Sequence, residues 1–121
     1  PFNTTIPWKA RVDQMITWFT NERNPINLGV LYIEEPDLHA HGVGTQHPQV
    51  LELLQKLDEL TKYIHDKLNE NELQDVNVIH LSDHGMMDVG IPKIVNISSF
   101  LSKDDYDAVT SPVTMFIMPH T

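Results

Sequence analysis

Two short apolar runs separated by one long amphipathic segment constrain the fold of this chain more than any other feature. The runs are residues 28–33 and 76–81, and both have the length and apolar content of buried strands. Between residues 48 and 68, apolar side chains recur at helical intervals and charged side chains occupy the opposite face. The order strand, helix, strand predicts a right-handed crossover, with the two strands parallel in one sheet.

The remaining elements are predicted from shorter patterns. Trp8, Val12, Ile16 and Phe19 follow helical spacing and predict a first helix that ends ahead of Pro25. Residues 34–48 lack periodicity and predict a polar loop, residues 95–101 a short helix, and residues 113–118 a last strand. Together these elements predict an α/β fold, with a mostly parallel sheet flanked by helices.

The length and charge of the chain bound its organisation and partners. With 121 residues it has the size of one domain, and because it opens on Pro1 and stops after a predicted strand we expect a piece of a longer protein. The formal net charge is −9 and the basic residues do not cluster, which argues against a nucleic-acid groove or an anionic membrane surface. We find no signal peptide and no transmembrane segment in the sequence.

Two glycosylation sequons give a weak indication of location. Asn3 is followed by Thr4 and Thr5, and Asn96 precedes Ile97 and Ser98. Both sequences fit the N-glycosylation acceptor pattern. Such sites are compatible with an extracellular chain, and the absence of cysteine leaves the redox compartment undetermined.

Metal-ligand side chains follow both predicted strands. Asp37 and His41 come after the first strand, and Asp83 and His84 come directly after the second. Because parallel strands open their carboxyl ends on one edge of the sheet, we expect these four residues to share a metal cluster. Carboxylate oxygen combined with imidazole nitrogen suits zinc better than magnesium or calcium, and a pair of ions suits phosphoryl chemistry.

A structural interpretation of the same residues stands beside the metal site. Asp83 could hydrogen-bond backbone amides in a turn in which Gly85 supplies a positive φ. His39 and His47 are interpreted as surface residues or supports of the ligands. His65 and His80 fall in a predicted helix and strand, where a structural role is expected.

The two motifs resemble those of a known family. They are Glu35-Pro36-Asp37 with His41 and Gly44, and Ser82-Asp83-His84-Gly85-Met86. In this combination they resemble the ecto-nucleotide pyrophosphatase/phosphodiesterase family of the alkaline phosphatase superfamily, from about residue 8 to about residue 119. Within it, the chain is most similar to the nucleotide-cleaving branch of small, membrane-anchored members.

The resemblance implies a fold, two metal ions and a location. It implies an alkaline-phosphatase-like fold, incomplete here, in which residues 1–121 are part of a single phosphodiesterase catalytic domain. Asp37 and His41 would bind one Zn²⁺ ion, and Asp83 and His84 a second. The parent protein would be extracellular, either secreted or on the cell surface.

The resemblance also implies a substrate and a nucleophile. The substrate would be a nucleotide or dinucleotide phosphodiester. The nucleophilic threonine, a further Asp ligand and a third His ligand would lie outside this chain. The sequence departs from the family pattern at Ala40, where Gly is usual, and at Thr45, where Pro is usual.

Other functions remain open at this point. The same dimetal core serves phosphocholine lipids in other branches of the family and phosphate monoesters in the wider superfamily. A catalytically silent extracellular binding protein could also keep this fold.

Overall fold

The computed structural model describes residues 3–90, 95–111 and 114–120. The chain divides into two compact units, Pro1–Asp88 and Val89–Thr121. The first unit contains the helices α1 (Trp8–Phe19), α2 (Asp37–Val43) and α3 (Pro48–Glu70). The second contains the short 3₁₀ helices η2 (Ile97–Ser99) and η3 (Lys103–Asp105) and the strands β1 (Tyr106–Thr110) and β2 (Met115–Pro119).

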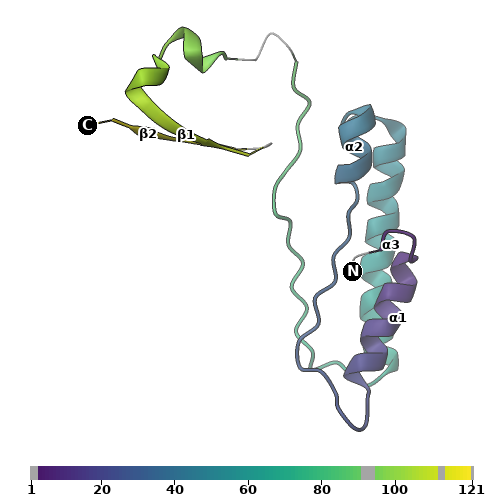
Figure 1. The fold of residues 1–121 in the computed structure, drawn as a ribbon. Coiled ribbons are helices and arrows are strands. Elements are labelled where there is room, and N and C mark those ends of the chain that lie inside the picture. Colours follow the sequence, from purple (N-terminus) through teal and green to yellow (C-terminus); the bar gives the residue numbers. More distant parts are fainter. Residues whose placement is uncertain (1–2, 91–94, 112–113, 121) are drawn as a thin grey trace. The chain divides into compact units, whose positions relative to one another are not determined.

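Helices α1 and α3 pack against each other and form the core of the first unit, as Figure 1 shows. Val12 and Ile16 from α1 meet Leu60 and Leu68 from α3, and Val12 is fully buried. The 3.6-residue repeat brings these side chains to one face of each helix. The sequence prediction of both helices is therefore confirmed.

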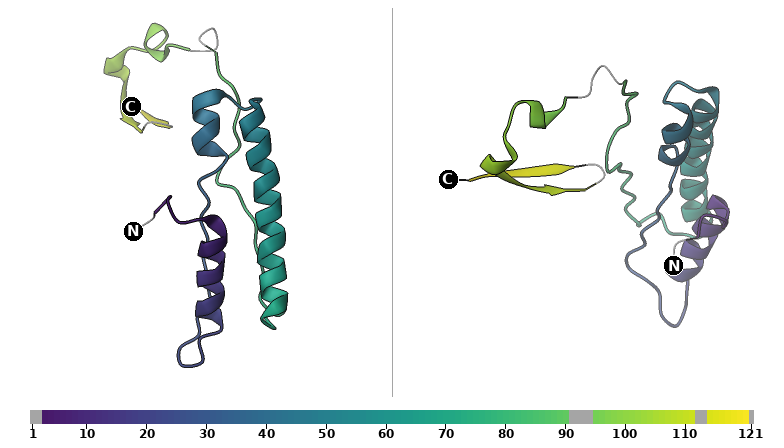
Figure 2. Two further views of the ribbon diagram at one scale, coloured as in Figure 1. Left: turned by 90° about the vertical axis from the view of Figure 1, so that its right-hand side faces the viewer. Right: turned by 45° about the horizontal axis from the view of Figure 1, so that its top comes forward.

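The two apolar runs are extended and lie against these helices, but neither forms a strand in the described part of the chain. Leu31 and Ile33 from the first run, and Val76 and Val78 from the second, pack on the helical core. Figures 1 and 2 show both runs leading in the same direction along the helices. The parallel sheet stays a prediction, because extended backbone becomes sheet only through a hydrogen-bonded ladder to a neighbouring strand.

The alternate side chains of these two runs face away from the helices. Val30 is 87% exposed and Leu81 is 83% exposed. Alternation of this kind is the normal consequence of extended backbone, which sends successive side chains to opposite faces. Each run therefore has one apolar face covered by the helices and a second apolar face that the described residues leave open.

The prediction of a continuous loop over residues 34–48 is wrong. Residues 37–43 form α2, whose only buried residue is Ala40. The segment is too short for a helical repeat to be visible in its sequence. Its first turn is stabilised by residues that precede it, which are described with the site below.

The second unit contains a β-hairpin. Strands β1 and β2 pair antiparallel, with Ala108 opposite Ile117, and the amide of Ser111 donates to the carbonyl of Thr114 over 2.8 Å. The predicted last strand corresponds to β2, although Val113 lies outside the described residues, whereas β1 was not predicted. The helix predicted over residues 95–101 is reduced to the single 3₁₀ turn η2. Among the described residues, no helix has the length and apolar character needed to cross a bilayer.

Candidate metal centre

A largely buried ion pair fixes the end of the first extended run, just before the predicted ligands. Arg11 on α1 donates to both carboxylate oxygens of Glu34, over 2.8 and 3.2 Å. The same guanidinium donates to the carbonyls of Ile6 and Tyr32. The hydrogen bond from Arg11 lowers the pKa of Glu34, so the carboxylate stays charged. The first helix therefore anchors the chain immediately upstream of Asp37.

A second carboxylate stabilises α2 itself. Glu35 accepts from the backbone amide of His39 over 3.2 Å and contacts the ring Nδ1 of His39 at 2.6 Å. The side chain of Glu35 is only 6% exposed. A carboxylate that accepts from a first-turn amide satisfies a group that the helix leaves unpaired and complements the helix dipole. His39 is therefore a support of the helix that carries Asp37 and His41.

Asp37 and His41 lie one helical turn apart on α2, so their side chains share a face. Nε2 of His41 is 3.5 Å from Oδ1 of Asp37, which is too long for a good hydrogen bond. Two ligands of one tetrahedral zinc ion, each at about 2.0–2.2 Å, lie about 3.3–3.6 Å apart. Oδ1 of Asp37 is shielded from solvent and accepts no hydrogen bond from any described residue. The spacing of this pair therefore fits two ligands of one metal ion better than it fits a direct hydrogen bond between the two side chains.

The ring of His84 is oriented by the backbone of the next residue, Gly85. Its Nδ1 lies 2.8 Å from the carbonyl of Gly85, which can only accept, so Nδ1 carries the proton in this contact. In the neutral ring, Nε2 is then left with its lone pair, as in histidines that bind metals. The pKa of His84 is raised, first by the hydrogen bond to Gly85 and then by the charge of Asp83.

Asp83 forms part of the polar turn predicted from the sequence, but the positive φ predicted for Gly85 is wrong, because Gly44 is the glycine with a positive φ among the described residues. Oδ1 of Asp83 accepts from the amide of His84 over 3.1 Å, as in a polar turn. Its Oδ2 lies 3.7 Å from Nε2 of His84. The turn therefore occupies one carboxylate oxygen, and the other lies near the imidazole ring.

The two pairs lie next to each other. Nε2 of His84 is 4.0 Å from Oδ1 of Asp37. His41 and His84 are 71% and 57% exposed, so an ion from solution can reach both rings. Among residues 3–90, 95–111 and 114–120, no group of three or more His, Asp or Glu side chains is arranged to hold one ion. The chain thus presents two adjacent pairs of zinc-type donors.

The other histidines of this unit have structural contacts. Nδ1 of His47 accepts from the amide of Gln49 at the start of α3, as an N-cap does. The rings of His65 and His80 lie with their centroids 5.6 Å apart. None of these contacts involves the four predicted ligands.

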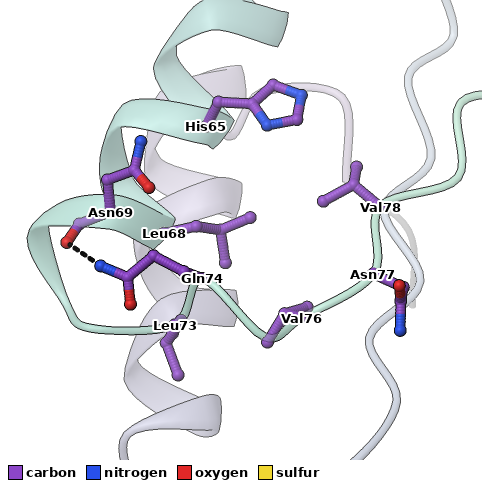
Figure 3. Close-up of a pocket in the computed structure, with 8 residues that line it drawn as sticks. All are labelled: His65, Leu68, Asn69, Leu73, Gln74, Val76, Asn77 and Val78. Atoms are coloured by element: carbon purple, nitrogen blue, oxygen red, sulfur yellow. Dashed lines mark hydrogen bonds between the residues drawn. The ribbon is translucent and has the colours of Figure 1, made fainter.

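A cavity of about 320 Å³ opens between the C-terminal end of α3 and the second extended run, away from these ligands. Figure 3 shows His65 directed toward Val78 across it, and Gln74 donating to the carbonyl of Asn69 over 3.4 Å. His65 is the one ionisable group among its lining residues, which are otherwise apolar or amide side chains. The cavity therefore offers no acid and base pair and no ligand pair for a metal.

Asp88 makes a contact that was not predicted from the sequence. Its carboxylate accepts from the amide and the hydroxyl of Thr45, over 2.8 and 3.1 Å. It thereby joins the segment after Asp83 and His84 to the turn after α2. An acidic residue a few positions beyond the second motif is its only signal in the sequence, and that signal is too weak to assign a partner.

Adjacent pairs of carboxylate and imidazole groups of this kind are typical of proteins that bind zinc or a similar transition metal. The chain is a member of the type I phosphodiesterase / nucleotide pyrophosphatase family, whose family model matches residues 1–120.

Curated relatives are matched over nearly the whole chain. Human ectonucleotide pyrophosphatase/phosphodiesterase family member 5 is 32% identical over 120 residues, which is 98% of this chain and 25% of the relative. The bis(5'-adenosyl)-triphosphatase enpp4 of Xenopus laevis is 30% identical over 98% of this chain and 26% of its own length. Venom phosphodiesterase 2 of Crotalus adamanteus is 29% identical over 92% of this chain and 14% of the relative. The chain therefore spans about a quarter or less of the length of these relatives.

A solved structure shares the fold. An inactive form of murine ectonucleotide pyrophosphatase/phosphodiesterase 5, in complex with AMP, matches with a TM-score of 0.74 and 33% identity. The match covers 98% of this chain and 32% of that chain. The alkaline-phosphatase-like fold class is supported by this match, while the described residues themselves contain only the two-stranded antiparallel sheet of β1 and β2.

Proposed function

We propose that this chain supplies part of the zinc centre of an enzyme that hydrolyses nucleotide phosphodiester or pyrophosphate bonds. The observation that carries the proposal is the position of Oδ1 of Asp37, which is shielded, accepts no hydrogen bond from the described residues, and lies 3.5 Å from Nε2 of His41 and 4.0 Å from Nε2 of His84. Membership of the phosphodiesterase family supports the reaction type. Both units of the chain would then belong to one catalytic domain, which the family match over residues 1–120 supports.

Asp37 and His41 would hold one Zn²⁺ ion, and Asp83 and His84 a second. When bound, the ions supply positive charge that stabilises the negative charge developing on the phosphoryl oxygens. Within this chain, the Gly85 carbonyl orients His84, and Glu35 holds the helix that presents Asp37 and His41. Catalytic zinc usually has three protein ligands, so the further ligands and the threonine nucleophile would come from other parts of the parent protein.

A nucleotide is the substrate that the relatives favour. The matched murine structure holds AMP, and the Xenopus relative is named for hydrolysis of bis(5'-adenosyl) triphosphate. The net charge of −9 on this chain would repel a phosphate ester, which makes a local cation necessary for binding. Two alternatives remain. The substrate could be a phosphocholine lipid, or the protein could be a catalytically silent binding protein.

The location we propose is extracellular, with the parent protein secreted or held at the cell surface. Asn3 and Asn96 are both exposed, as a glycan would require. In each sequon the hydroxyl of Thr5 or Ser98 donates to the Asn Oδ1, over 2.8 and 2.7 Å. The amide nitrogen that receives a glycan is thus left pointing away from this bond.

The test of function uses the full-length parent protein with three chromogenic substrates: a nitrophenyl ester of a nucleotide, nitrophenyl phosphocholine and nitrophenyl phosphate. We expect turnover of the nucleotide ester, its loss on treatment with a chelator and its return with zinc. A preference for the phosphocholine ester would support the lipid alternative. A zinc-loaded protein inert toward all three substrates would support the silent binding protein.

A further inference from the structure

The two ligand pairs come from segments that are distant in sequence, so something must hold those segments together. Asp37 and His41 lie on α2, whereas Asp83 and His84 lie after the second extended run. Helix α2 has seven residues and buries only Ala40. A helix of this length is not stable in water without tertiary contacts. The position of its ligands therefore depends on its packing against α3 and on contacts at its ends.

The N-terminal end of α2 is held by Glu35, which immediately precedes the helix in the sequence. The C-terminal end is held by Asp88, which belongs to the segment that carries Asp83 and His84. Both oxygens of the Asp88 carboxylate are used, one by the amide of Thr45 at 2.8 Å and one by its hydroxyl at 3.1 Å. Hydrogen bonds to a charged acceptor are about twice as strong as neutral ones.

Gly44 lies beside this contact. It ends α2 with its amide donating to the carbonyl of Ala40 over 2.9 Å, and its φ is +87°, which favours glycine. A Cβ at this position would lie 3.3 Å from Oδ1 of Asp88. A side chain at this position would therefore displace the carboxylate by a few tenths of an ångström.

We propose that Asp88 is a positioning residue that fixes the end of α2, and with it Asp37 and His41, relative to Asp83 and His84. Asp88 lies four residues after His84 on the same segment, so its bonds to Thr45 set the spacing between the two ligand pairs. The proposal rests on the zinc centre proposed above. It adds a residue that binds neither metal nor substrate and acts through the geometry of those that do.

The test measures zinc affinity of the full-length protein by competition with a chromophoric chelator, together with thermal unfolding of the metal-free protein. Asp88→Ala removes both hydrogen bonds, and we expect zinc affinity to fall about 10–100-fold, as for other residues that support metal ligands. Asp88→Asn retains an acceptor for the Thr45 amide, so its zinc affinity should fall less than that of Asp88→Ala. Asp58→Ala, on the exposed face of α3, removes the same charge and should leave affinity unchanged.

The ligand variant Asp83→Asn separates this inference from the proposed function. If Asp83→Asn binds zinc as tightly as the wild type, the zinc centre itself is wrong and the role of Asp88 falls with it. If Asp83→Asn loses zinc affinity while Asp88→Ala binds zinc as tightly as Asp58→Ala does, only the role of Asp88 is overturned. A loss of zinc affinity in Asp88→Ala, with a metal-free unfolding temperature close to that of Asp58→Ala, supports the inference.

Should Asp88→Ala fail to fold, Thr45 provides the decisive comparison. Thr45→Ser keeps the amide and the hydroxyl, so its zinc affinity should equal that of the wild type. Thr45→Val has the size of threonine and keeps the amide, but it loses the hydroxyl bond to Asp88. We expect Thr45→Val to bind zinc several-fold more weakly than Thr45→Ser, and equal affinities would overturn the inference.

Discussion

Nε2 of His84 lies 4.0 Å from Oδ1 of Asp37, although one residue follows the second extended run and the other begins α2. This distance joins the two motifs into one site. Without it, each motif would be a common local feature: an Asp and a His one helical turn apart, and a polar turn after an apolar run. Their proximity is what directs the tests toward shared metal chemistry.

Removal of a ligand should abolish activity without unfolding the protein. In the full-length protein we expect Asp37→Asn and His41→Ala each to lower kcat/KM for a nucleotide nitrophenyl ester by more than about 100-fold, since even supporting residues of metal sites cost 10–100-fold. His65→Ala, outside the site, is the matched control for a lost imidazole. Near-wild-type activity in His41→Ala would contradict its assignment as a ligand.

The 121 residues alone should not turn over substrate. They provide two ligands for each proposed ion and no nucleophile, so zinc binding should be weak and the covalent step should have no attacking group. The measurement is release of nitrophenol from the nucleotide ester with added zinc, with the full-length protein as positive control. Zinc-dependent turnover by the isolated chain would show that the nucleophile lies within it.

The Arg11–Glu34 pair should make stability depend on pH in the acid range. Because Arg11 holds the pKa of folded Glu34 below its ordinary value of 4.5, the contribution of the pair is complete above that value and is lost as the pH falls through the lower, folded pKa. Glu34→Gln should therefore lower the free energy of unfolding at neutral pH. The free energy of unfolding of this variant should also fall less steeply in acid than that of the wild type. Denaturant unfolding between about pH 2 and pH 7 measures this, with Glu52→Gln on the exposed face of α3 as control.

The contact of α1 with α3 should dominate the stability of the first unit. Leu60 is 4% exposed and belongs to the core with Val12 and Ile16. Leu60→Ala should destabilise by about 2–5 kcal/mol, whereas the exposed Glu52→Ala should change stability by less than about 0.5 kcal/mol. Denaturant titration of the full-length protein gives both values, and similar values for the two variants would contradict the packing described here.

Glycosylation at the two sequons is checked by expression through the secretory pathway. We expect a loss of mass on treatment with peptide N-glycosidase, and a smaller loss in Thr5→Val and in Ser98→Ala, because each removes the hydroxyl that the acceptor pattern requires. Each single variant controls for the other site. An unchanged mass in the wild type would leave both asparagines unmodified and remove this support for the extracellular location.

Periodicity predicted the long elements and missed the short ones. The apolar repeats of α1 and α3 are long enough to define a face, whereas α2 has seven residues and depends on Glu35, His39 and Asp88, whose contacts form only in the folded chain. Strand β1 contains one acidic and four uncharged residues without a clear alternation. This segment is a strand because it pairs with β2.

The proximity of the ligand pairs followed from the order of the elements, because chain segments that cross one layer in the same direction end at the same edge. The role of Asp88 did not follow. Thr45 was visible only as a departure from the proline that the family usually has there. Proline lacks both the amide hydrogen and the hydroxyl, so it could make neither of the bonds that Thr45 makes to Asp88.

The open apolar faces of the two extended runs also affect how the isolated chain will behave in the test tube. Extended backbone with exposed valine, isoleucine and leucine side chains is the form that recruits further chains into intermolecular sheets. Val30 in the first run and Leu81 in the second are side chains of this kind. Preparations of residues 1–121 alone should therefore aggregate as concentration rises, and charged substitutions at these outward positions should keep them in solution.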